Sequence, residues 1–380
     1  MDRKFDGRVP VWQSAVFYIC CLLFGVTFIF SGFVKAIDPL GTVYKIEDYL
    51  VAMHLDALNP LSGVAAFALF SMEFLTGMLI LLNIRFREGL ILGTAFMAVM
   101  TPLTLWIALE NPVTDCGCFG DALVISNTAT FWKNVVLCLM VAAMWVFRCA
   151  HRRWVSTLPS WLLLVAFLLI PVSVGCYSLH SLPFKDFRPY HIGASIEEGM
   201  EMPEGAEPDQ YETTFVYMKD GETREFTLAD APYNDSTWTF VEQHTELIKK
   251  GYTPPIHDFS IITMEGDDVT YDVLDNPGRT YLALMYDLAK TDRTKAADLE
   301  SLYLLAQSQG AGFYALTASV DLIEGYVMET GVTFPFAMTD PIQLKTMVRA
   351  NPGVLVIENG IIIDKWNVEQ QKKHLKKLMK

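Results

Sequence analysis

The sequence predicts an α-helical transmembrane bundle followed by a soluble α/β domain, and three observations carry this prediction. The 380 residues are 52% hydrophobic, with a mean hydropathy of +0.29. Residues 1–180 hold 11 basic and 11 acidic residues among long apolar stretches, whereas residues 181–380 hold 18 basic and 32 acidic residues. The net charge of -14 therefore belongs to the second half. We expect that half to be soluble, and its acidity excludes a nucleic-acid-binding protein.

Five apolar runs predict the transmembrane bundle. They cover residues 11–34, 61–83, 89–109, 130–148 and 158–178. Each is close to the ~20 residues that cross ~30 Å of hydrocarbon. The first run is too long for a cleaved secretion signal and lacks a small-residue cleavage site, so we expect it to remain a membrane helix. Five spans would place the two termini on opposite sides of the membrane.

Basic residues predict the orientation of the bundle. Eight flank one face and three flank the other: Arg3, Lys4, Arg8, Arg85, Arg87, Arg148, Arg152 and Arg153 against Lys35, Lys45 and Lys133. Basic flanks stay in the cytoplasm, which places the N-terminus there. The loops 35–60 and 110–129 and everything after about residue 179 are then exported. In a bacterium this means an inner-membrane protein with a periplasmic C-terminal domain.

Between the first two runs, the stretch from Asp38 to Asn59 predicts an amphipathic helix at the outer membrane interface, forming a lid over the bundle. Residues 181–254 are expected to be an exported linker. Within it, Tyr211–Met218 and Thr223–Leu228 flank a turn at 219–222 and predict a β-hairpin. Residues 255–380 alternate between predicted strands and helices and end in a hairpin around Asn359, which indicates an α/β sheet.

The seven cysteines differ in their predicted surroundings. Cys20, Cys21 and Cys138 fall inside helices and Cys149 lies at the cytoplasmic side, so these four are interpreted as packing or inert residues. Cys116, Cys118 and Cys176 face the oxidising side. Residues 181–380 contain no cysteine.

The Cys116-Gly117-Cys118 turn is the strongest candidate redox centre. Glycine permits the backbone angles of a short disulfide ring, and a strained ring has a raised reduction potential. A structural turn is one alternative. A metal site is the other, disfavoured because the loop has no adjacent histidine to complete a zinc site. Cys176 is a candidate resolving thiol, although many membrane cysteines are inert.

Glu73 is the one acid deep within an apolar run, where an ionisable group needs a partner or a neutral state. It could relay a proton or bond a quinone head group, with Lys35 as a candidate but more superficial partner. The alternative is a protonated carboxyl that fixes helix packing through Ser31, Ser71 or Thr104.

Three stretches of the soluble half resemble the thioredoxin fold in its peroxiredoxin and TlpA-like form: Pro255–Ser260, Thr333–Asp340 and Ala350–Ile357. The resemblance implies a cis Pro352, which with Asn351 would line a partner-binding groove. The segment 288–293, where the dithiol of that fold would stand, contains no cysteine. We therefore expect this domain to hold a partner and not to perform redox chemistry alone.

The membrane half resembles the DoxX/MauE family of redox-associated membrane proteins. Ser31–Lys35, Glu73 and Asp115–Gly120 carry the resemblance, which implies a four-helix bundle within the five predicted helices.

Together these features predict an inner-membrane protein that exchanges electrons or disulfides with an exported protein through Cys116 and Cys118. A quinone is a candidate cofactor, and lipid surrounds the bundle. One alternative is a non-enzymatic assembly factor whose Cys116-Gly117-Cys118 turn is structural. Another is a small-molecule binder or transporter that acts near Glu73.

Overall fold

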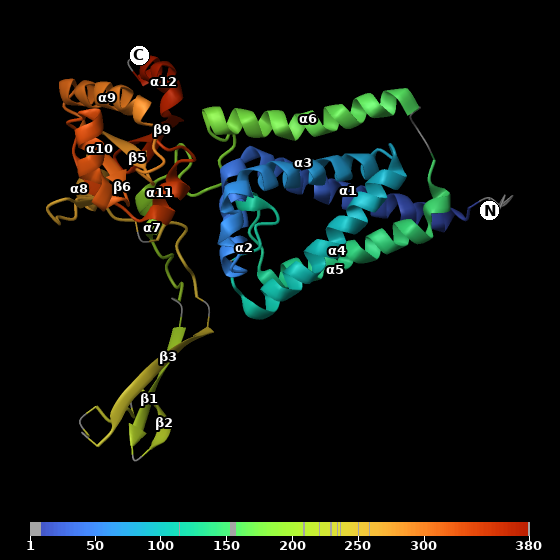
Figure 1. The fold of residues 1–380 in the computed structure, drawn as a ribbon, viewed down its shortest axis with the longest axis horizontal. Coiled ribbons are helices and arrows are strands. Elements are labelled where there is room, and N and C mark those ends of the chain that lie inside the picture. Colours follow the sequence, from blue (N-terminus) through green and yellow to red (C-terminus); the bar gives the residue numbers. More distant parts are fainter. Residues whose placement is uncertain are drawn as a thin grey trace.

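The computed structural model describes residues 9–378 except residues 114, 153–156, 208, 209, 220, 229, 234, 236, 250 and 258. Arg3, Lys4, Arg8 and Arg153 of the orientation argument, and Asp220 and Asp258 of the predicted segments, lie outside the described residues. The chain has a helical bundle at one end and a sheet-containing domain at the other (Figure 1).

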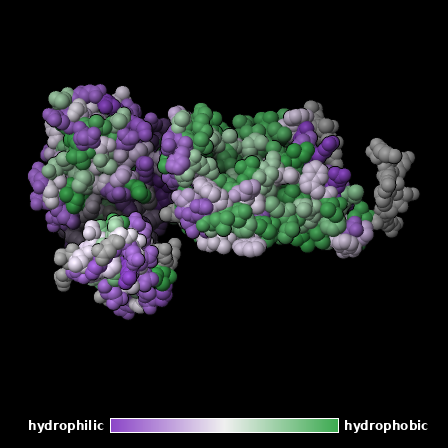
Figure 2. Space-filling view, turned by 60° about the horizontal axis from the view of Figure 1, so that its bottom comes forward, coloured by the Kyte–Doolittle hydropathy of each residue, from purple (hydrophilic) through white to green (hydrophobic). Residues whose placement is uncertain are grey.

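Five long helices form the bundle: α1 (Val11–Ile37), α3 (Ser62–Leu81), α4 (Phe86–Glu110), α5 (Asn127–Val146) and α6 (Thr157–Ser181). Each is long and apolar enough to cross a membrane, α3 together with the preceding 3-10 turn η1 (Asp56–Leu61). Apolar residues cover much of the visible side of the bundle, whereas the soluble domain is largely polar (Figure 2). The five predicted spans are confirmed, and the chain is a membrane protein.

Glycines bring α1 and α3 into close contact. A Cβ atom on Gly32 would lie 2.6 Å from the carbonyl oxygen of Phe70, and one on Gly77 would lie 2.7 Å from that of Gly25. Small residues are needed at such contacts because helix pairs in lipid associate by close packing. The α1–α3 pair also carries Lys35 and Glu73, so this packing sets their separation.

Helix α2 (Pro39–Ala52) lies across the end of the bundle, between it and the soluble domain (Figure 1). Asp38 caps it by accepting a hydrogen bond from Gly41 N at 2.9 Å, and Pro39 occupies the first turn, where its missing N–H costs nothing. This is the predicted amphipathic helix. The loop after α4 contains the short turn η2 (Gly120–Ala122), and η3 (Arg148–Ala150) follows α5.

The soluble domain is a six-stranded sheet in the order β4-β7-β6-β5-β8-β9. Its elements are β4 (Ile262–Thr263), α8 (Thr270–Leu274), β5 (Arg279–Met285), η4 (Arg293–Lys295), α9 (Ala296–Ser308), β6 (Gly312–Thr317), η5 (Val320–Leu322), α10 (Ile323–Thr330), β7 (Phe336–Met338), α11 (Pro341–Met347), β8 (Gly353–Glu358), β9 (Ile361–Asn367), η6 (Val368–Gln370) and α12 (Gln371–Leu378). Strands β5, β6 and β7 are parallel, and β8 and β9 form an antiparallel hairpin. The Asn351–Pro352 peptide is cis. The predicted thioredoxin-like fold is confirmed.

Strand β5 shows why the central sheet has no polar face. Tyr281, Ala283 and Met285 join the core on one side, with α9 and α10, whereas Leu282 and Leu284 join the core on the other, with α8 and α11. A strand covered on both faces is apolar without interruption, because successive side chains point to opposite faces.

The predicted linker contributes to two structures. Tyr190 and Ile196, the latter in α7 (Ile196–Met200), are fully buried in the soluble core, and Ser195 bridges to Ile361. Farther along, β1 (Gln210–Lys219), β2 (Glu222–Thr227) and β3 (Thr239–Lys249) form a separate antiparallel sheet in the order β2-β1-β3, which projects from the domain (Figure 1). The predicted hairpin is β1–β2. Strand β3 is not predicted from the sequence, because the continuous polar run 242–246 lacks the alternation of a half-buried strand.

Candidate functional site

The loop after α4 places the thiols of Cys116 and Cys118 beside each other, with their Sγ atoms 3.0 Å apart. Both are free cysteines. Cys116 is 8% exposed and packs with Ile107 and Val113, whereas Cys118 is half-buried. The two residues that the sequence singled out therefore form one dithiol site at the end of the bundle.

Two helices hold the backbone on either side of Gly117. Tyr49 of α2 donates its hydroxyl to the carbonyl oxygen of Cys116 at 2.6 Å. Lys35 of α1 donates to the carbonyl oxygen of Cys118 at 2.7 Å. Gly117 has a φ of +62°, and a Cβ atom there would lie 2.7 Å from Cγ of Lys45. A side chain at position 117 is thus opposed by backbone strain and by steric contact.

Below the loop, Lys35 and Glu73 form a buried ion pair. The Lys35 Nζ lies 2.8 Å from Oε2 of Glu73 and 2.7 Å from Oγ of Ser31, in addition to its bond to Cys118. These acceptors can use all three donors of the ammonium group. Both residues are 6% exposed, so the prediction of a more superficial Lys35 is wrong. The helix geometry explains the error, because Lys35 stands one turn after Ser31 on the face that packs against α3.

Of the three partners proposed for Glu73 as a packing residue, the structure supports one. The Oγ of Ser31 lies 2.9 Å from Oε2 of Glu73. The hydroxyl of Thr104 instead donates to the carbonyl oxygen of Met100 at 2.8 Å, and the buried hydroxyl of Ser71 has no hydrogen-bond partner among the described residues. Glu73 thus contacts both Lys35, its partner in the functional interpretation, and Ser31, one of its partners in the packing alternative.

The two thiols are electrostatically unequal. The hydrogen bond from Cys116 lowers the pKa of Cys118 to about 6, against the effect of burial, and the positive charges of Lys133 and Lys35 act in the same direction. The pKa of Cys116 is raised, first by that same hydrogen bond and then by burial. Lys133 lies over the ring of Phe119, 4.4 Å from its centroid. Cys118 is therefore the thiol that carries negative charge at neutral pH.

A cavity of about 1050 Å³ opens beside the thiols. Lys35, Glu73, Cys116 and Cys118 line it, and apolar side chains of the bundle extend it between the helices: Phe28, Phe96, Met97, Met100 and Leu137. Side chains of the soluble domain form another part of its wall: His257, Ile342, Lys345, Thr346 and Arg349. The site thus belongs to both halves of the chain.

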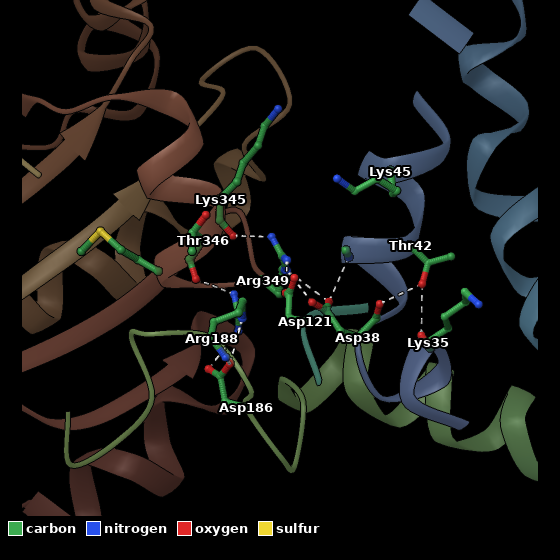
Figure 3. Close-up of polar contacts among 12 residues, drawn as sticks. Lys35, Asp38, Thr42, Lys45, Asp121, Asp186, Arg188, Lys345, Thr346 and Arg349 are labelled. Carbon is green, nitrogen blue, oxygen red and sulfur yellow. Dashed lines mark hydrogen bonds and ion pairs between the residues drawn. The ribbon is translucent and has the colours of Figure 1, made fainter. Parts of the chain in front are cut away.

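Arg349 joins the halves through two acids (Figure 3). Its Nε lies 3.1 and 2.9 Å from the carboxylate oxygens of Asp38, and its Nη2 lies 3.3 Å from Oδ2 of Asp121. None of these contacts is predicted from the sequence. Asp38 before Pro39 is recognisable as a helix cap, but no local pattern points to a partner 311 residues away.

In the thioredoxin-like domain, the segment 288–293, which has no cysteine, is connected by hydrogen bonds to the cis-proline loop. The Oγ1 of Thr291 donates to Oδ1 of Asn351 at 2.9 Å, and Nδ2 of Asn351 donates to the carbonyl oxygen of Asp287 at 2.8 Å. Pro352 is buried. The prediction that Asn351 and Pro352 bind a partner stays a prediction.

The remaining predicted site residue, Cys176, is exposed on α6 and is not among the residues that line the cavity. Its role as a resolving thiol stays a prediction. Among the described residues, no group of three or more histidine, cysteine or acidic side chains is arranged to hold a metal ion.

The fold and site define a membrane protein whose bundle presents a paired-thiol loop to a tethered thioredoxin-like domain. Residues 13–148 match the family described as methylamine utilisation protein MauE, which confirms that part of the predicted resemblance. Residues 211–250, which include most of β1 and β3, match a domain of unknown function. No curated protein matches the chain.

Solved structures resemble the soluble part of the chain. StoA from Bacillus subtilis is 16% identical, over 30% of this chain and 93% of its own, with a TM-score of 0.25. The thioredoxin domain of a thiol-disulfide oxidoreductase from Bacteroides vulgatus is 12% identical, over 31% of this chain and 90% of its own, with a TM-score of 0.26. A thiol:disulfide interchange protein from Bacteroides sp. is 12% identical, over 31% of this chain and 84% of its own, with a TM-score of 0.26.

Proposed function

We propose that this chain is a redox protein of the bacterial inner membrane that exchanges disulfides with an exported protein through Cys116 and Cys118. The observation that carries the proposal is the pairing of two thiols, with Sγ atoms 3.0 Å apart, on a loop fixed by the buried Lys35–Glu73 pair. Burying two charges costs desolvation energy, so the presence of the ion pair beside the thiols favours a functional role for it. Perturbed pKa values also cluster at functional sites.

The inequality of the thiols assigns their order of reaction. The Cys118 thiolate attacks a disulfide sulfur of the partner, the partner's S–S bond breaks, and its leaving thiolate takes up a proton. Cys116 then loses its proton to solvent and attacks the Cys118 sulfur, which releases the second partner thiolate, and this thiolate also takes up a proton from solvent. The partner gains two electrons and two protons, and Cys116 and Cys118 become a disulfide. The reverse sequence oxidises a partner dithiol.

The cavity supports a lipid-soluble electron acceptor for repeated oxidation of partners. Its wall combines apolar side chains such as Phe96 and Met97 with the polar Lys35–Glu73 pair, which suits a ring with an apolar body and oxygen acceptors. A quinone has this chemistry, and when bound it would accept two electrons from the dithiol. Lys35 already donates to Glu73, Ser31 and the carbonyl oxygen of Cys118, so it would donate to such an acceptor in place of one of these bonds.

The orientation follows from the basic residues of the sequence. The described residues Arg85, Arg87 and Arg148 lie at the bundle end opposite the thiols: Arg85 precedes α4, Arg87 is in its first turn, and Arg148 is in η3. With these residues in the cytoplasm, the thiols and the thioredoxin-like domain face the periplasm, where disulfides persist. Cys176 would then be a third exported thiol, able to react only with a partner that reaches the exposed side of α6.

Thiol trapping in cells tests the proposal. After acid quenching and alkylation, peptide mass spectrometry should find residues 116 and 118 in both oxidised and reduced forms. Cys116→Ser removes the thiol that resolves the mixed disulfide, so it should accumulate a covalent adduct between Cys118 and the partner. Cys138→Ser, which changes a thiol within α5, is the matched control and should accumulate none.

A pair that stays permanently oxidised, with Cys116→Ser affecting only stability, would contradict the redox proposal and favour a structural turn in an assembly factor. The cavity at Glu73 supports one other candidate, a small-molecule binder or transporter. That function would survive replacement of both cysteines by serine and be lost in Glu73→Gln.

A further inference from the structure

The thioredoxin-like domain rests with its groove side against the membrane bundle. Tyr286, at the end of β5, packs edge-on against Tyr44 of α2, with ring centroids 6.4 Å apart and planes at 85°. Lys345 of α11 lies over the Tyr44 ring, 5.0 Å from its centroid. Arg349 stands two residues before the cis Asn351–Pro352 peptide. The side of the domain that carries the cysteine-free segment 288–293 therefore contacts this chain's own helix α2.

Arg349 is the central residue of this contact. It is 8% exposed, and its guanidinium bonds Asp38, Asp121 and the carbonyl oxygen of Lys345, the last at 2.7 Å. Asp38 caps α2, and Asp121 belongs to η2, three residues after Cys118. One side chain of the soluble domain thus connects the base of α2 with the loop that carries the thiols (Figure 3).

The two acids are held unequally. Burial would raise the pKa of Asp38, but the charges of Arg349 and Arg188 outweigh it and lower that pKa. For Asp121 burial dominates, and the pKa is raised despite Arg349. The geometry agrees, because Asp38 makes two short contacts and Asp121 makes one of 3.3 Å. Asp38 is the firm anchor, and Asp121 is the weaker connection to the thiol loop.

A second arginine fixes α11 from the linker side. Arg188 donates from Nη1 to the carbonyl oxygen of Thr346 at 2.6 Å, while Asp186 binds its Nε and Nη2 at 2.8 and 3.0 Å. Lys365 of β9 also bonds Asp186. The end of α11 is therefore held between two buried arginines (Figure 3). Their charged hydrogen bonds fix the position of the helix end.

We propose that the docked thioredoxin-like domain is a latch over the thiol pair, closed by Arg349 on Asp38 and Asp121. In the closed state, small molecules that fit the shared cavity reach Cys118, and a protein partner reaches it only after the domain releases. The biological meaning of this access rests on the proposed disulfide exchange. Which reagents reach the thiols does not depend on that exchange.

Alkylation of the reduced full-length protein in lipid nanodiscs tests the latch. Iodoacetamide serves as the small reagent and a maleimide on a 5-kDa polyethylene glycol, a size chosen to exceed the cavity, as the large one, with the peptide of residues 115–121 quantified by mass spectrometry. Arg349→Gln should raise the rate with the large reagent at least tenfold and change the rate with the small reagent less than threefold. Arg349→Lys keeps the charge and should fall between. Arg293→Gln, which removes an exposed ion pair with Glu329 in the same domain, is the matched control.

Equal acceleration of both reagents in Arg349→Gln would show a loosened loop, and unchanged rates would show no gate; either result overturns the latch. Should Arg349→Gln fail to fold, Asp38→Asn removes the firm anchor from the membrane side and should give the same ratio of rates, whereas Asp121→Asn should give a smaller one. The assay needs neither partner nor turnover. The alkylation assay can therefore contradict the latch while thiol trapping in cells supports disulfide exchange. It can also support the latch while thiol trapping contradicts the exchange.

Discussion

The two halves of this chain separate a fold from the chemistry usually associated with it. The soluble domain has the thioredoxin-like sheet and its cis-proline, but the segment 288–293 has no cysteine. Thr291 of that segment instead forms a hydrogen bond with Asn351. The membrane half has no such sheet and holds the paired thiols of Cys116 and Cys118. A fold therefore does not locate the chemistry, which depends on particular side chains in particular surroundings.

Each half also buries a lysine, and the two lysines differ in their surroundings. Lys35 pairs with Glu73 and contacts the thiol loop through the carbonyl oxygen of Cys118. Lys365 bonds Asp186 and the carbonyl oxygens of Tyr190 and Met347 in the soluble domain. Burial lowers the pKa of Lys365 to about 8, against the attraction of Asp186. One lysine supports a reactive loop, whereas the other supports the junction between linker and sheet.

The largest expected effect is on the bundle. Lys35→Met leaves the Glu73 carboxylate buried without its counter-charge, which should cost about 3–5 kcal/mol of stability. The double variant Lys35→Met/Glu73→Leu removes both charges and should recover most of that loss. Unfolding in mixed micelles with increasing dodecyl sulfate measures both. A double variant no more stable than Lys35→Met would contradict the ion pair.

A smaller effect is expected from the same substitution in the soluble domain. Lys365→Met leaves Asp186 paired with Arg188, so the loss should be about 1–3 kcal/mol, the cost of stranding hydrogen-bond acceptors. Thermal unfolding followed by circular dichroism measures it. The alkylation rate of Cys118 with iodoacetamide should stay unchanged. A loss as large as that of Lys35→Met would remove the distinction between the two lysines.

The smallest expected effect is a shift in thiol reactivity with pH. The reactive form of Cys118 is the thiolate, so its alkylation rate should rise as pH increases through about 6, its lowered pKa. Lys133→Gln removes a positive charge that favours the thiolate. The midpoint should therefore move upward, by roughly one unit or less. The measurement is a rate profile from pH 4.5 to 9 on the reduced protein.

Lys295→Gln, a substitution on η4 of the soluble domain, is the control for that profile and should leave the midpoint in place. A midpoint near the ordinary thiol value in the unaltered protein would contradict the assigned inequality of Cys116 and Cys118. A downward shift in Lys133→Gln would contradict the electrostatic role of Lys133.

Much of the fold could be predicted because its signals are local. An apolar run long enough to cross a membrane has few alternatives to a helix, and the short apolar runs 281–286, 354–357 and 361–366 that predict strands are each formed by neighbouring residues. Strand β3 escaped prediction because its pairing with β1 is fixed by a partner and not by its own pattern. The same limit applies to Lys35, whose burial depends on how closely α1 approaches α3.

The sequence by itself determined the membrane spans, the Cys116-Gly117-Cys118 turn and the absence of cysteine from the second half, since each is written in contiguous residues or in composition. Only the tertiary structure decided that Lys35 pairs with Glu73 beneath the turn and that Arg349 reaches Asp38 and Asp121. Ion pairs between distant segments leave no periodic trace, because a single side chain at each end suffices to form them. The thiol turn was visible as a motif, but the ion pair of the nearby Asp121 with Arg349 of the thiol-free domain was visible only in the tertiary structure.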